Sequence, residues 1–173
     1  MKRALSIPMR RNRGSALLET ALYLPILFLL LFGMIELARV TYTYYTLQKM
    51  LVTVARYLGT QQGVNFCDDA DPGIQAAKSF ALTGATDGSA EPYLSELRAE
   101  NIQVRIERYT AATNEIGQCE CSATGCDTSA GGQGPDHIVV SIPDGYSIRL
   151  RIPQLPLDPI LLRPQVRVPF QGT

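Results

Sequence analysis

The most apolar stretch of the chain extends from Leu17 to Ile35 and contains two polar residues near its start, Glu19 and Thr20. As a helix it would be about 28 Å long, which matches the roughly 30 Å hydrocarbon core of a membrane. Five positive charges and no negative charge precede it: Lys2, Arg3, Arg10, Arg11 and Arg13. Because such charges stay in the cytoplasm, the pattern predicts a single-pass protein with its N-terminus inside and its main body outside.

The helical pattern continues beyond this apolar stretch. Neither Gly nor Pro occurs between Met34 and Leu58, and Gly59 is a natural helix stop. In the last part of this segment apolar residues recur at helical spacing, so we expect them to pack on the chain's own globular part. These residues are Leu47, Met50, Leu51, Val54 and Leu58.

Several residues of the long helix predict local features. Pro25 removes one helical hydrogen bond, so a kink or a loosened turn is expected there. Glu36 and Arg39 are spaced i,i+3 and should pair where the helix leaves the membrane. Three tyrosines follow where an interfacial aromatic belt is expected: Tyr42, Tyr44 and Tyr45.

The rest of the chain predicts a small α+β domain. A short helix is expected over 72–83, with Pro72 at its start and Gly84 at its end. Its expected buried side consists of Ile74, Ala77, Phe80 and Ala81. A second short helix is possible near 92–100. Alternating apolar and polar residues predict strands at 102–109, 137–142 and 146–152, a hairpin turn at 143–146, and an edge strand at 165–170, whereas 113–136 has the composition of a loop.

Charge and composition exclude several function classes. The net charge is zero, but the segment after residue 14 carries 11 Lys and Arg against 16 Asp and Glu, because five of the 16 basic residues precede it. An acidic main body is poorly suited to nucleic acid. The glycine-rich run 131–134 lacks the Lys-Ser/Thr of a phosphate loop, and no Gly-x-Ser-x-Gly elbow occurs. We therefore expect no enzyme activity, no cofactor and no metal.

Four cysteines are expected to form disulfides, because the main body is predicted to lie outside the cytoplasm. They are Cys67, Cys119, Cys121 and Cys126. A bond between the first two of the 119–126 cluster would close a very small ring, which leaves two schemes. Either Cys67 pairs with Cys119 and Cys121 with Cys126, or Cys67 pairs with Cys121 and Cys119 with Cys126. A zinc site that includes His137 is the less favoured alternative, because the spacing is not a usual zinc pattern.

Other fates of an N-terminal apolar stretch fit the sequence less well. Signal peptidase needs small residues at positions −3 and −1, but the best site, after Ala38, has Glu36 at −3. A lipoprotein would need a cysteine at the cleavage site, and the first cysteine is Cys67. A plain anchor leaves Glu19 unexplained, because a carboxylate inside an apolar span costs about 2.5–3.5 kcal/mol.

The residues before Glu19 suggest an explanation. The stretch Arg13-Gly14-Ser15-Ala16-Leu17-Leu18-Glu19 resembles the processing site of type IV prepilins, in which a membrane peptidase cuts after the Gly and a Glu stands fifth in the product. The resemblance implies a mature chain that begins at Ser15 and keeps its apolar helix. The new α-ammonium would lie four residues before Glu19 on one helical face, so the two charges can neutralise each other. The resemblance also implies that in a filament this Glu receives the N-terminus of a neighbouring subunit, which would favour one axial register.

A longer stretch resembles the TadE-like pseudopilins of tight-adherence (Tad) pilus systems. The similarity lies in Gly14-Ser-Ala-Leu-Leu-Glu-Thr-Ala-Leu-Tyr-Leu-Pro25, Gly33-Met-Ile-Glu36-Leu-Ala-Arg39 and Ala55-Arg56-Tyr57. It implies a pilin-like α+β fold, with a long N-terminal helix followed by a small antiparallel sheet domain with disulfide-tied loops. The parts would be a basic leader (1–14), a transmembrane helix (15–36), an amphipathic extension (37–59) and an extracytoplasmic head (60–173).

The same resemblance implies a minor pilin or pseudopilin that takes part in assembling an adhesive Tad pilus. Its partners would be the prepilin peptidase, other pilin or pseudopilin subunits and the assembly platform in the bacterial inner membrane. The N-terminus would be cytoplasmic and the head periplasmic, with transfer to the extracellular pilus on incorporation. A permanently anchored envelope protein with a disulfide-stabilised binding domain is the alternative. A secreted enzyme is less consistent with the missing signal-peptidase site.

Overall fold

The computed structural model describes residues 13–111, 113–151 and 158–172, and the expected basic leader lies almost entirely outside them. The described residues fall into two units, 13–39 with 151 and 40–150 with 158–172. The fold is α+β, as predicted: a long N-terminal apolar helix is followed by a small antiparallel sheet domain with two disulfides.

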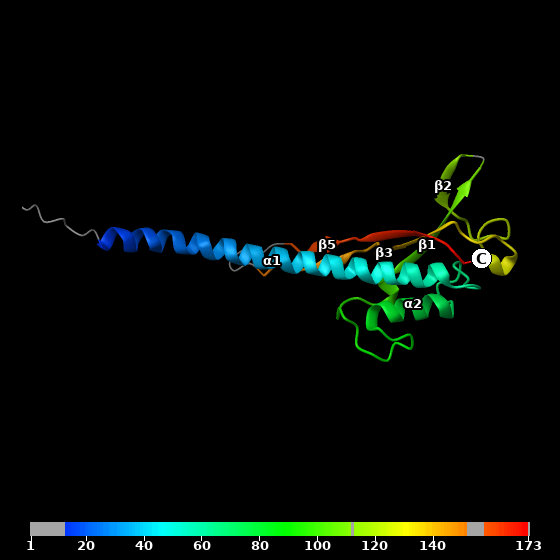
Figure 1. The fold of residues 1–173 in the computed structure, drawn as a ribbon, viewed down its shortest axis with the longest axis horizontal. Helices are drawn as coiled ribbons and strands as arrows, with labels where there is room; N and C mark the ends of the chain where they lie inside the picture. The colour runs from blue at the N-terminus through cyan, green and yellow to red at the C-terminus, as the bar shows by residue number, and fades with distance from the viewer. Residues whose placement is uncertain (1–12, 112, 152–157, 173) are drawn as a thin grey trace, which may run out of the picture. The chain divides into compact units, whose positions relative to one another are not determined.

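The first element, helix α1, extends from Arg13 to Thr60 as 48 continuous residues, drawn blue to cyan in Figure 1. It passes through Pro25 without interruption; the expected kink stays a prediction. The helix ends slightly later than expected, since Gly59 lies within it. A Cβ on Gly59 would lie 3.6 Å from the Pro169 carbonyl oxygen, an ordinary van der Waals distance, so packing does not require a glycine at this position.

The predicted apolar stripe of α1 forms the centre of the core. Leu47, Leu51, Val54 and Leu58 are completely buried, and Met50 is 5% exposed. The residues between them that were expected to lie off the stripe remain at least partly accessible, among them Lys49 and Arg56. The C-terminal half of α1 is therefore an amphipathic helix that packs on the globular part of its own chain, as its spacing predicted.

Helix α2 spans Pro72–Thr83, as predicted. Asp71 caps its start by accepting a hydrogen bond from the Gly73 N–H, and Gly84 ends it with φ 81°, a backbone conformation that favours glycine. The expected buried face was wrong at one position: Phe80 is 39% exposed, whereas Lys78 is completely buried. Position 78 is the helical neighbour of Ile74 and Ala81, so geometry places it on the buried stripe despite its charge.

A four-stranded antiparallel sheet covers the core in the order β2-β1-β3-β6. Its strands are β1 (Gln103–Thr110), β2 (Glu115–Gln118), β3 (His137–Ser141) and β6 (Gln165–Pro169). Three of them confirm predicted strands, and β6 lies at an edge as expected. Strand β2 was missed within the supposed loop 113–136, because its four residues are all exposed and carry no apolar alternation.

The expected hairpin between 137–142 and 146–152 was wrong. A turn does form, with the Gly145 N–H donating to the Ile142 carbonyl. However, β6 occupies the position beside β3, where Val166 and Val168 pair with Val140 and Ile138. Strand β4 (Tyr146–Ile148) instead pairs with β5 (Ile160–Leu162) in a separate two-stranded sheet. Residues 152–157, the end of the predicted strand and its continuation, lie outside the described residues.

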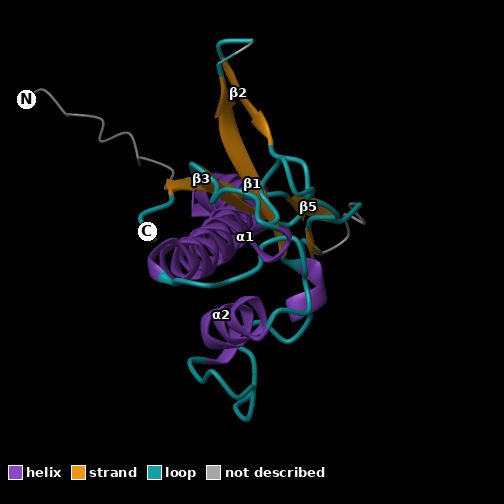
Figure 2. Cartoon of the chain, turned by 90° about the vertical axis from the view of Figure 1, so that its right-hand side faces the viewer, coloured by secondary structure: helices purple, strands orange, loops and turns teal. Residues whose placement is uncertain are grey.

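The second short helix, expected near 92–100, was also wrong. Only a 3-10 turn, η1 (Ala99–Asn101), forms at the end of this segment, and another, η2 (Thr128–Ala130), follows β2. In both views α2 and the β1–β2 hairpin lie on opposite sides of the C-terminal half of α1 (Figures 1 and 2).

Candidate functional site: the exposed half of helix α1 and the disulfide-linked loops

The N-terminal half of α1 exposes nearly all of its large apolar side chains. Between Leu17 and Leu37 each of the leucines, isoleucines and phenylalanines is at least 41% exposed. This is the single helix, among the described residues, that is long and apolar enough to cross a membrane, with a mean hydropathy of 2.2 in its most apolar window. Such an apolar surface requires a partner, either lipid or other protein.

The expected processing site lies in the first turns of this helix. Gly14 and Ser15 follow directly after the first helical residue, and Glu19 is exposed on the helix surface. A Cβ built on Gly14 would meet no other atom within 4 Å. The fold therefore gives no packing reason for a glycine at this position.

Glu19 has no salt bridge among the described side chains. Its neighbour Thr20 donates a hydrogen bond to the Ala16 carbonyl, 2.8 Å away, and so satisfies its hydroxyl within the helix. A threonine can return its polar group to the backbone in this way, but a carboxylate accepts hydrogen bonds and finds no free donor inside a helix. Glu19 is thus the polar residue of the exposed half that needs an external partner.

Glu36 and Arg39 of α1 form the ion pair that their spacing predicted. Arg39 Nη1 lies 3.4 Å from Glu36 Oε2, and Glu36 is buried to 8% exposure. Next come the three tyrosines, of which Tyr42 and Tyr45 are 74% and 61% exposed. Tyr44 accepts a hydrogen bond from Gln48 on its hydroxyl oxygen. These rings have the exposure that an interfacial position requires.

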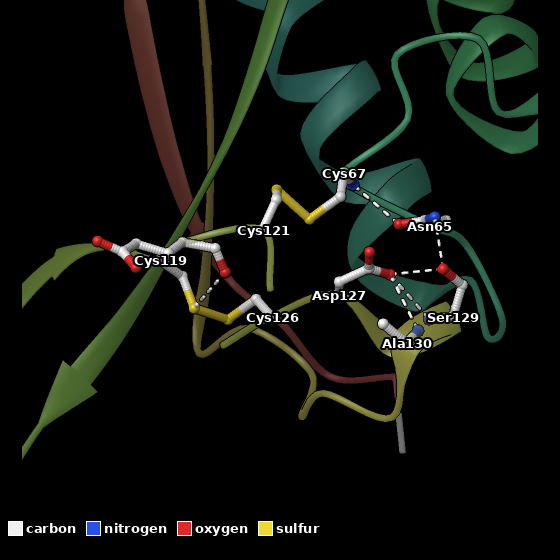
Figure 3. The surroundings of a disulfide bond; sticks show 9 residues. Asn65, Cys67, Cys119, Cys121, Cys126, Asp127, Ser129 and Ala130 are labelled. Atoms are coloured by element: carbon white, nitrogen blue, oxygen red, sulfur yellow. Dashed lines mark hydrogen bonds between the residues drawn. A yellow bond between two sulfur atoms is a disulfide. The ribbon is translucent and has the colours of Figure 1, made fainter. Parts of the chain in front are cut away.

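All four cysteines form disulfides, in the second of the two predicted schemes (Figure 3). Cys67 bonds to Cys121 and Cys119 bonds to Cys126. The first bond joins the loop after α1 to the loop after β2. The Asn65 side-chain N–H donates to the Ser129 hydroxyl, 3.3 Å away, and adds a second link between the same loops. No sulfur remains free to bind zinc as a thiolate.

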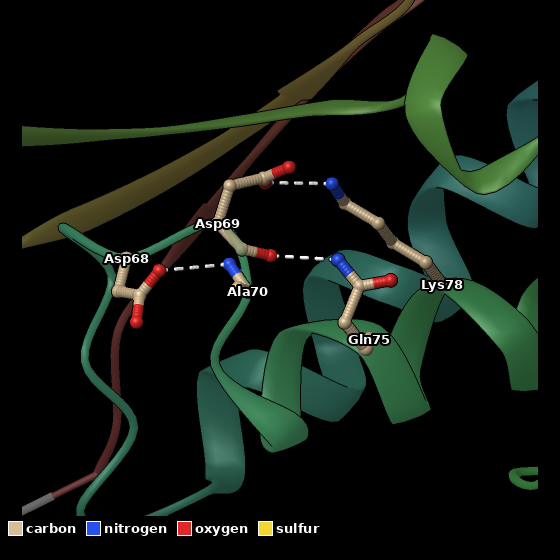
Figure 4. A network of polar contacts seen from close by, with 5 residues as sticks. All are labelled: Asp68, Asp69, Ala70, Gln75 and Lys78. Atoms are coloured by element: carbon tan, nitrogen blue, oxygen red, sulfur yellow. Dashed lines mark hydrogen bonds and ion pairs between the residues drawn. The ribbon is translucent and has the colours of Figure 1, made fainter.

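A network of polar contacts joins the loop after α1 to helix α2 (Figure 4). Lys78 Nζ lies 2.6 Å from Asp69 Oδ1, and the Gln75 side chain donates to the Asp69 carbonyl at 2.6 Å. Asp68 accepts from the Ala70 N–H. Each of these acids therefore has a partner within the protein. The burial of Lys78 was not predicted, and the signal that could have identified it is its i,i+4 spacing from Ile74.

Asp127 stabilises the loop that carries the cysteine cluster. Its carboxylate accepts hydrogen bonds from the Ser129 hydroxyl and from the Ser129 and Ala130 N–H groups. The bond from the Ser129 hydroxyl is the main cause that holds the pKa of Asp127 below its ordinary value. The same arrangement, a carboxylate bonded to Ser89, lowers the pKa of Asp87 in the loop after α2.

Residues 14–56 match the family described as TadE-like protein. The matched segment lies within α1 and begins at Gly14. The match confirms the resemblance seen in the sequence and indicates a protein associated with the Tad pilus. No match was found among curated proteins or among solved structures.

Proposed function

We propose that this protein is a minor pseudopilin of a Tad-type pilus, cleaved between Gly14 and Ser15 and assembled through its apolar helix. The observation that carries the proposal is a carboxylate, Glu19, exposed in an apolar helix five residues after a glycine that has no packing role. The family match that begins at the same glycine supports it.

The proposed mechanism follows from the chemistry of the helix terminus. Cleavage removes the basic leader and creates an α-ammonium at Ser15. Since Glu19 lies four residues later on the same helical face, the two opposite charges compensate each other in the membrane. On assembly the apolar half of α1 exchanges lipid for neighbouring helices. Glu19 then receives the N-terminus of an adjacent subunit, and in low dielectric this attraction penalises an axial slip.

The globular part is suited to an oxidising compartment. One of its two disulfides connects the loop after α1 to the loop after β2 and the other closes a short ring within the second loop, and disulfides persist outside the cytoplasm. We therefore place the N-terminus in the cytoplasm, the helix in the bacterial inner membrane and the globular part in the periplasm. Its proposed partners are the prepilin peptidase, other pilin or pseudopilin subunits and the assembly platform.

The proposed role is assembly of an adhesive pilus, with no catalysis, cofactor or nucleic-acid partner. Among the described residues no group of three or more His, Cys, Asp or Glu side chains is placed to hold a metal ion. The three aspartates of the loop after α1, which resemble a calcium loop in composition, bind the Ala70 amide, the Lys78 ammonium and the N-terminus of α2.

Mass spectrometry of the protein, made together with a prepilin peptidase, tests this proposal. The wild-type chain should begin at Ser15. The variant Gly14→Ala should keep residue 1, because on this proposal the peptidase requires glycine at this position. Gly33→Ala is the matched control, since a Cβ there also meets no atom within 4 Å, and it should be processed like the wild type.

Three outcomes would contradict the proposal. A wild-type chain that begins at Met1 in the presence of the peptidase would favour a permanently anchored envelope protein. A chain that begins near Arg39 would indicate secretion. Equal processing of Gly14→Ala and wild type would show that the glycine has another role.

A further inference from the structure

The β1–β2 hairpin is the part of the globular unit that is least covered by the rest of the chain. In Figures 1 and 2 it projects away from the helices. All four residues of β2 are exposed. On its surface Tyr109 and Ile116 form a cross-strand pair and are 48% and 45% exposed. A two-stranded ribbon with both faces in solvent is marginally stable by itself, so its retention in a fixed position calls for an explanation.

The register of the hairpin shows where its free backbone groups point. The Cys119 N–H donates to the Ile106 carbonyl at 2.9 Å, so these two residues form a hydrogen-bonded pair. Pairs alternate along an antiparallel ladder, which leaves Ile116 and Gln118 in non-hydrogen-bonded positions. Their backbone N–H and C=O groups therefore point away from β1. No described strand pairs with this outer edge.

The edge is held rigidly at its base. The Tyr109 N–H donates to Asp136 Oδ2 at 2.7 Å, and the Asp136 N–H donates to the Glu107 carbonyl at 3.0 Å. The Cys119–Cys126 disulfide begins directly after β2. Because these contacts order the hairpin in the unbound protein, a partner strand would not have to order it on binding, which favours association.

The surroundings of the edge are polar and acidic. A hollow of about 560 Å³ beside the base of the hairpin is lined largely by polar residues, including Arg108, Thr110, Gln118, Glu120 and Ser122. Arg108 donates to the Gln133 side chain within the protein. Two exposed acids, Glu115 and Glu120, flank the outer edge of β2, and residues 113–136 contain neither Lys nor Arg. An acidic edge favours a basic partner and disfavours an acidic one.

Two properties of the chain argue against a second copy at this edge. Pairing of β2 with β2 of another copy would add a second set of the acidic side chains Glu115 and Glu120 to the same edge, which is unfavourable. The opposite edge of the sheet, β6, is closed at its end, because Pro169 has no N–H and the Gln171 N–H donates to the Gly59 carbonyl of α1. A strand from a different protein fits the β2 edge better than either edge of this chain.

We propose that the outer edge of β2 binds an extended, basic segment of a different protein by strand addition. The backbone groups of Ile116 and Gln118 supply the hydrogen bonds, and the acidic side chains Glu115 and Glu120 select basic residues on the added strand. On the proposed function, the protein that carries this segment is another component of the pilus. The binding itself does not depend on leader cleavage or on pilus assembly.

Amide hydrogen exchange of the isotope-labelled full chain, oxidised and in uncharged detergent micelles, tests the inference. The probe is a short synthetic peptide in which pairs of lysines alternate with pairs of threonines, so that both faces of the added strand carry lysine. The matched control peptide has glutamate in place of lysine. With the lysine peptide at about ten times its dissociation constant, exchange at Ile116 and Gln118 should slow about tenfold, because only the unbound fraction exchanges. The glutamate peptide should leave it unchanged, and amides of α2 should not respond to either peptide.

Two variants separate backbone pairing from other effects. Ile116→Pro removes an outward N–H without removing a bond to β1, so it should abolish the peptide's protection of Gln118. Glu115→Lys combined with Glu120→Lys keeps the backbone and should reverse the preference between the two peptides. If Ile116→Pro disturbs the hairpin, the charge-reversed variant still tests whether the edge selects a basic strand.

Three results would overturn the inference. They are no protection by either peptide, equal protection by both, and protection that rises with protein concentration in the absence of peptide, which would assign the edge to a second copy. Because no pilus is needed, failure here would leave the proposed function intact. Conversely, an uncleaved N-terminus would leave this test unaffected.

Discussion

The two halves of α1 belong to one helix, but their apolar residues have opposite environments. In the N-terminal half Leu17 is 73% exposed and Leu27 is 64% exposed, whereas in the C-terminal half Leu47 and Leu51 are completely buried. The difference is one of pattern. The first half is apolar on all sides, and the second half has a single apolar stripe with charged residues such as Lys49 beside it.

This contrast indicates which environment each half of α1 requires. A stripe can be covered by one surface, and the chain supplies that surface itself with α2 and the four-stranded sheet. A helix that is apolar all round must be surrounded, which requires lipid or several neighbouring helices. The same helix therefore stabilises the globular unit with one half and leaves the apolar surface of the other half for lipid or other helices.

The largest loss of stability, confined to the globular unit that buries the second half of α1, should come from removing the Cys67–Cys121 disulfide. The double change Cys67→Ser and Cys121→Ser removes it. Its cysteines are separated by 54 residues, so the chain-entropy model predicts a loss of about 4 kcal/mol in the free energy of unfolding. Urea unfolding followed by tyrosine fluorescence measures this loss. The helicity of the N-terminal half in micelles should not change.

The second disulfide provides the control. Cys119 and Cys126 are separated by only seven residues, so replacing both by serine should cost about 2 kcal/mol in the same model. Equal losses for the two double variants would show that loop length does not determine the stabilisation.

The next largest effect on stability is expected when the same type of substitution, leucine to alanine, is made in each half of α1. Leu51→Ala removes a completely buried side chain and should lower the free energy of unfolding of the globular unit by about 3 kcal/mol. Leu27→Ala, at an exposed position, should change it by less than about 0.5 kcal/mol. Urea unfolding in micelles measures both. Similar losses would mean that the N-terminal half also packs on the globular unit, and the contrast would be wrong.

Periodicity explains why so much of the fold could be predicted from the sequence. The stripe from Leu47 to Leu58, helix α2 with its Asp71 and Gly84 caps, and strands β1, β3 and β6 all follow local rules of spacing and capping. The expected ion pair Glu36–Arg39 also depends only on local spacing. In each case the residues that determine the structure lie within a few positions of each other.

The features that could not be predicted depend on distant partners. Strand β2 is exposed and polar and exists because β1 provides its hydrogen bonds. The turn at 142–145 does not lead to a hairpin because β6, more than 20 residues later, takes the place beside β3. The choice between the two disulfide schemes, and the burial of Lys78 opposite Asp69, likewise require the tertiary structure. For the candidate site, the sequence predicts roles for Gly14, Ser15 and Glu19, which stay predictions, but it gives no signal for the open edge of β2.

A smaller effect on stability, but a large effect on assembly, is expected for Glu19→Gln. Because Glu19 is exposed and has no salt bridge among the described side chains, the free energy of unfolding of the globular unit should change by less than about 0.5 kcal/mol. Pilus formation in cells that carry the variant should fail, since the N-terminus of the adjacent subunit loses its acidic partner. Electron microscopy of surface pili measures this result.

Thr20→Ala is the matched control for this substitution. It removes a neighbouring polar group whose hydrogen bond is satisfied within the helix, and it should leave pili unchanged. Normal pili with Glu19→Gln, together with a mature chain that begins at Ser15, would refute the role of the carboxylate in assembly. The proposed cleavage after Gly14 would still stand.

The smallest expected effect concerns the pH dependence of the loop that holds the disulfides to the C-terminal half of α1. Hydrogen bonds from Ser129 keep the pKa of Asp127 below its ordinary value of about 3.9. A carboxylate whose pKa is lower in the folded state adds stability that is complete above the ordinary value. This stability is lost as the pH falls through the lowered pKa.

The difference in unfolding midpoint between the wild type and Asp127→Asn should therefore be constant near neutral pH and shrink below about pH 4. Asp87→Asn is the matched control, because that carboxylate has the same kind of bond to Ser89 but lies in a loop without a disulfide. If the two variants show the same pH dependence, the effect is local to each turn. If only Asp127→Asn alters the midpoint, the Asp127 carboxylate stabilises the junction between the two disulfide-linked loops. A difference in midpoint that does not vary with pH would exclude the titration of Asp127 as its cause.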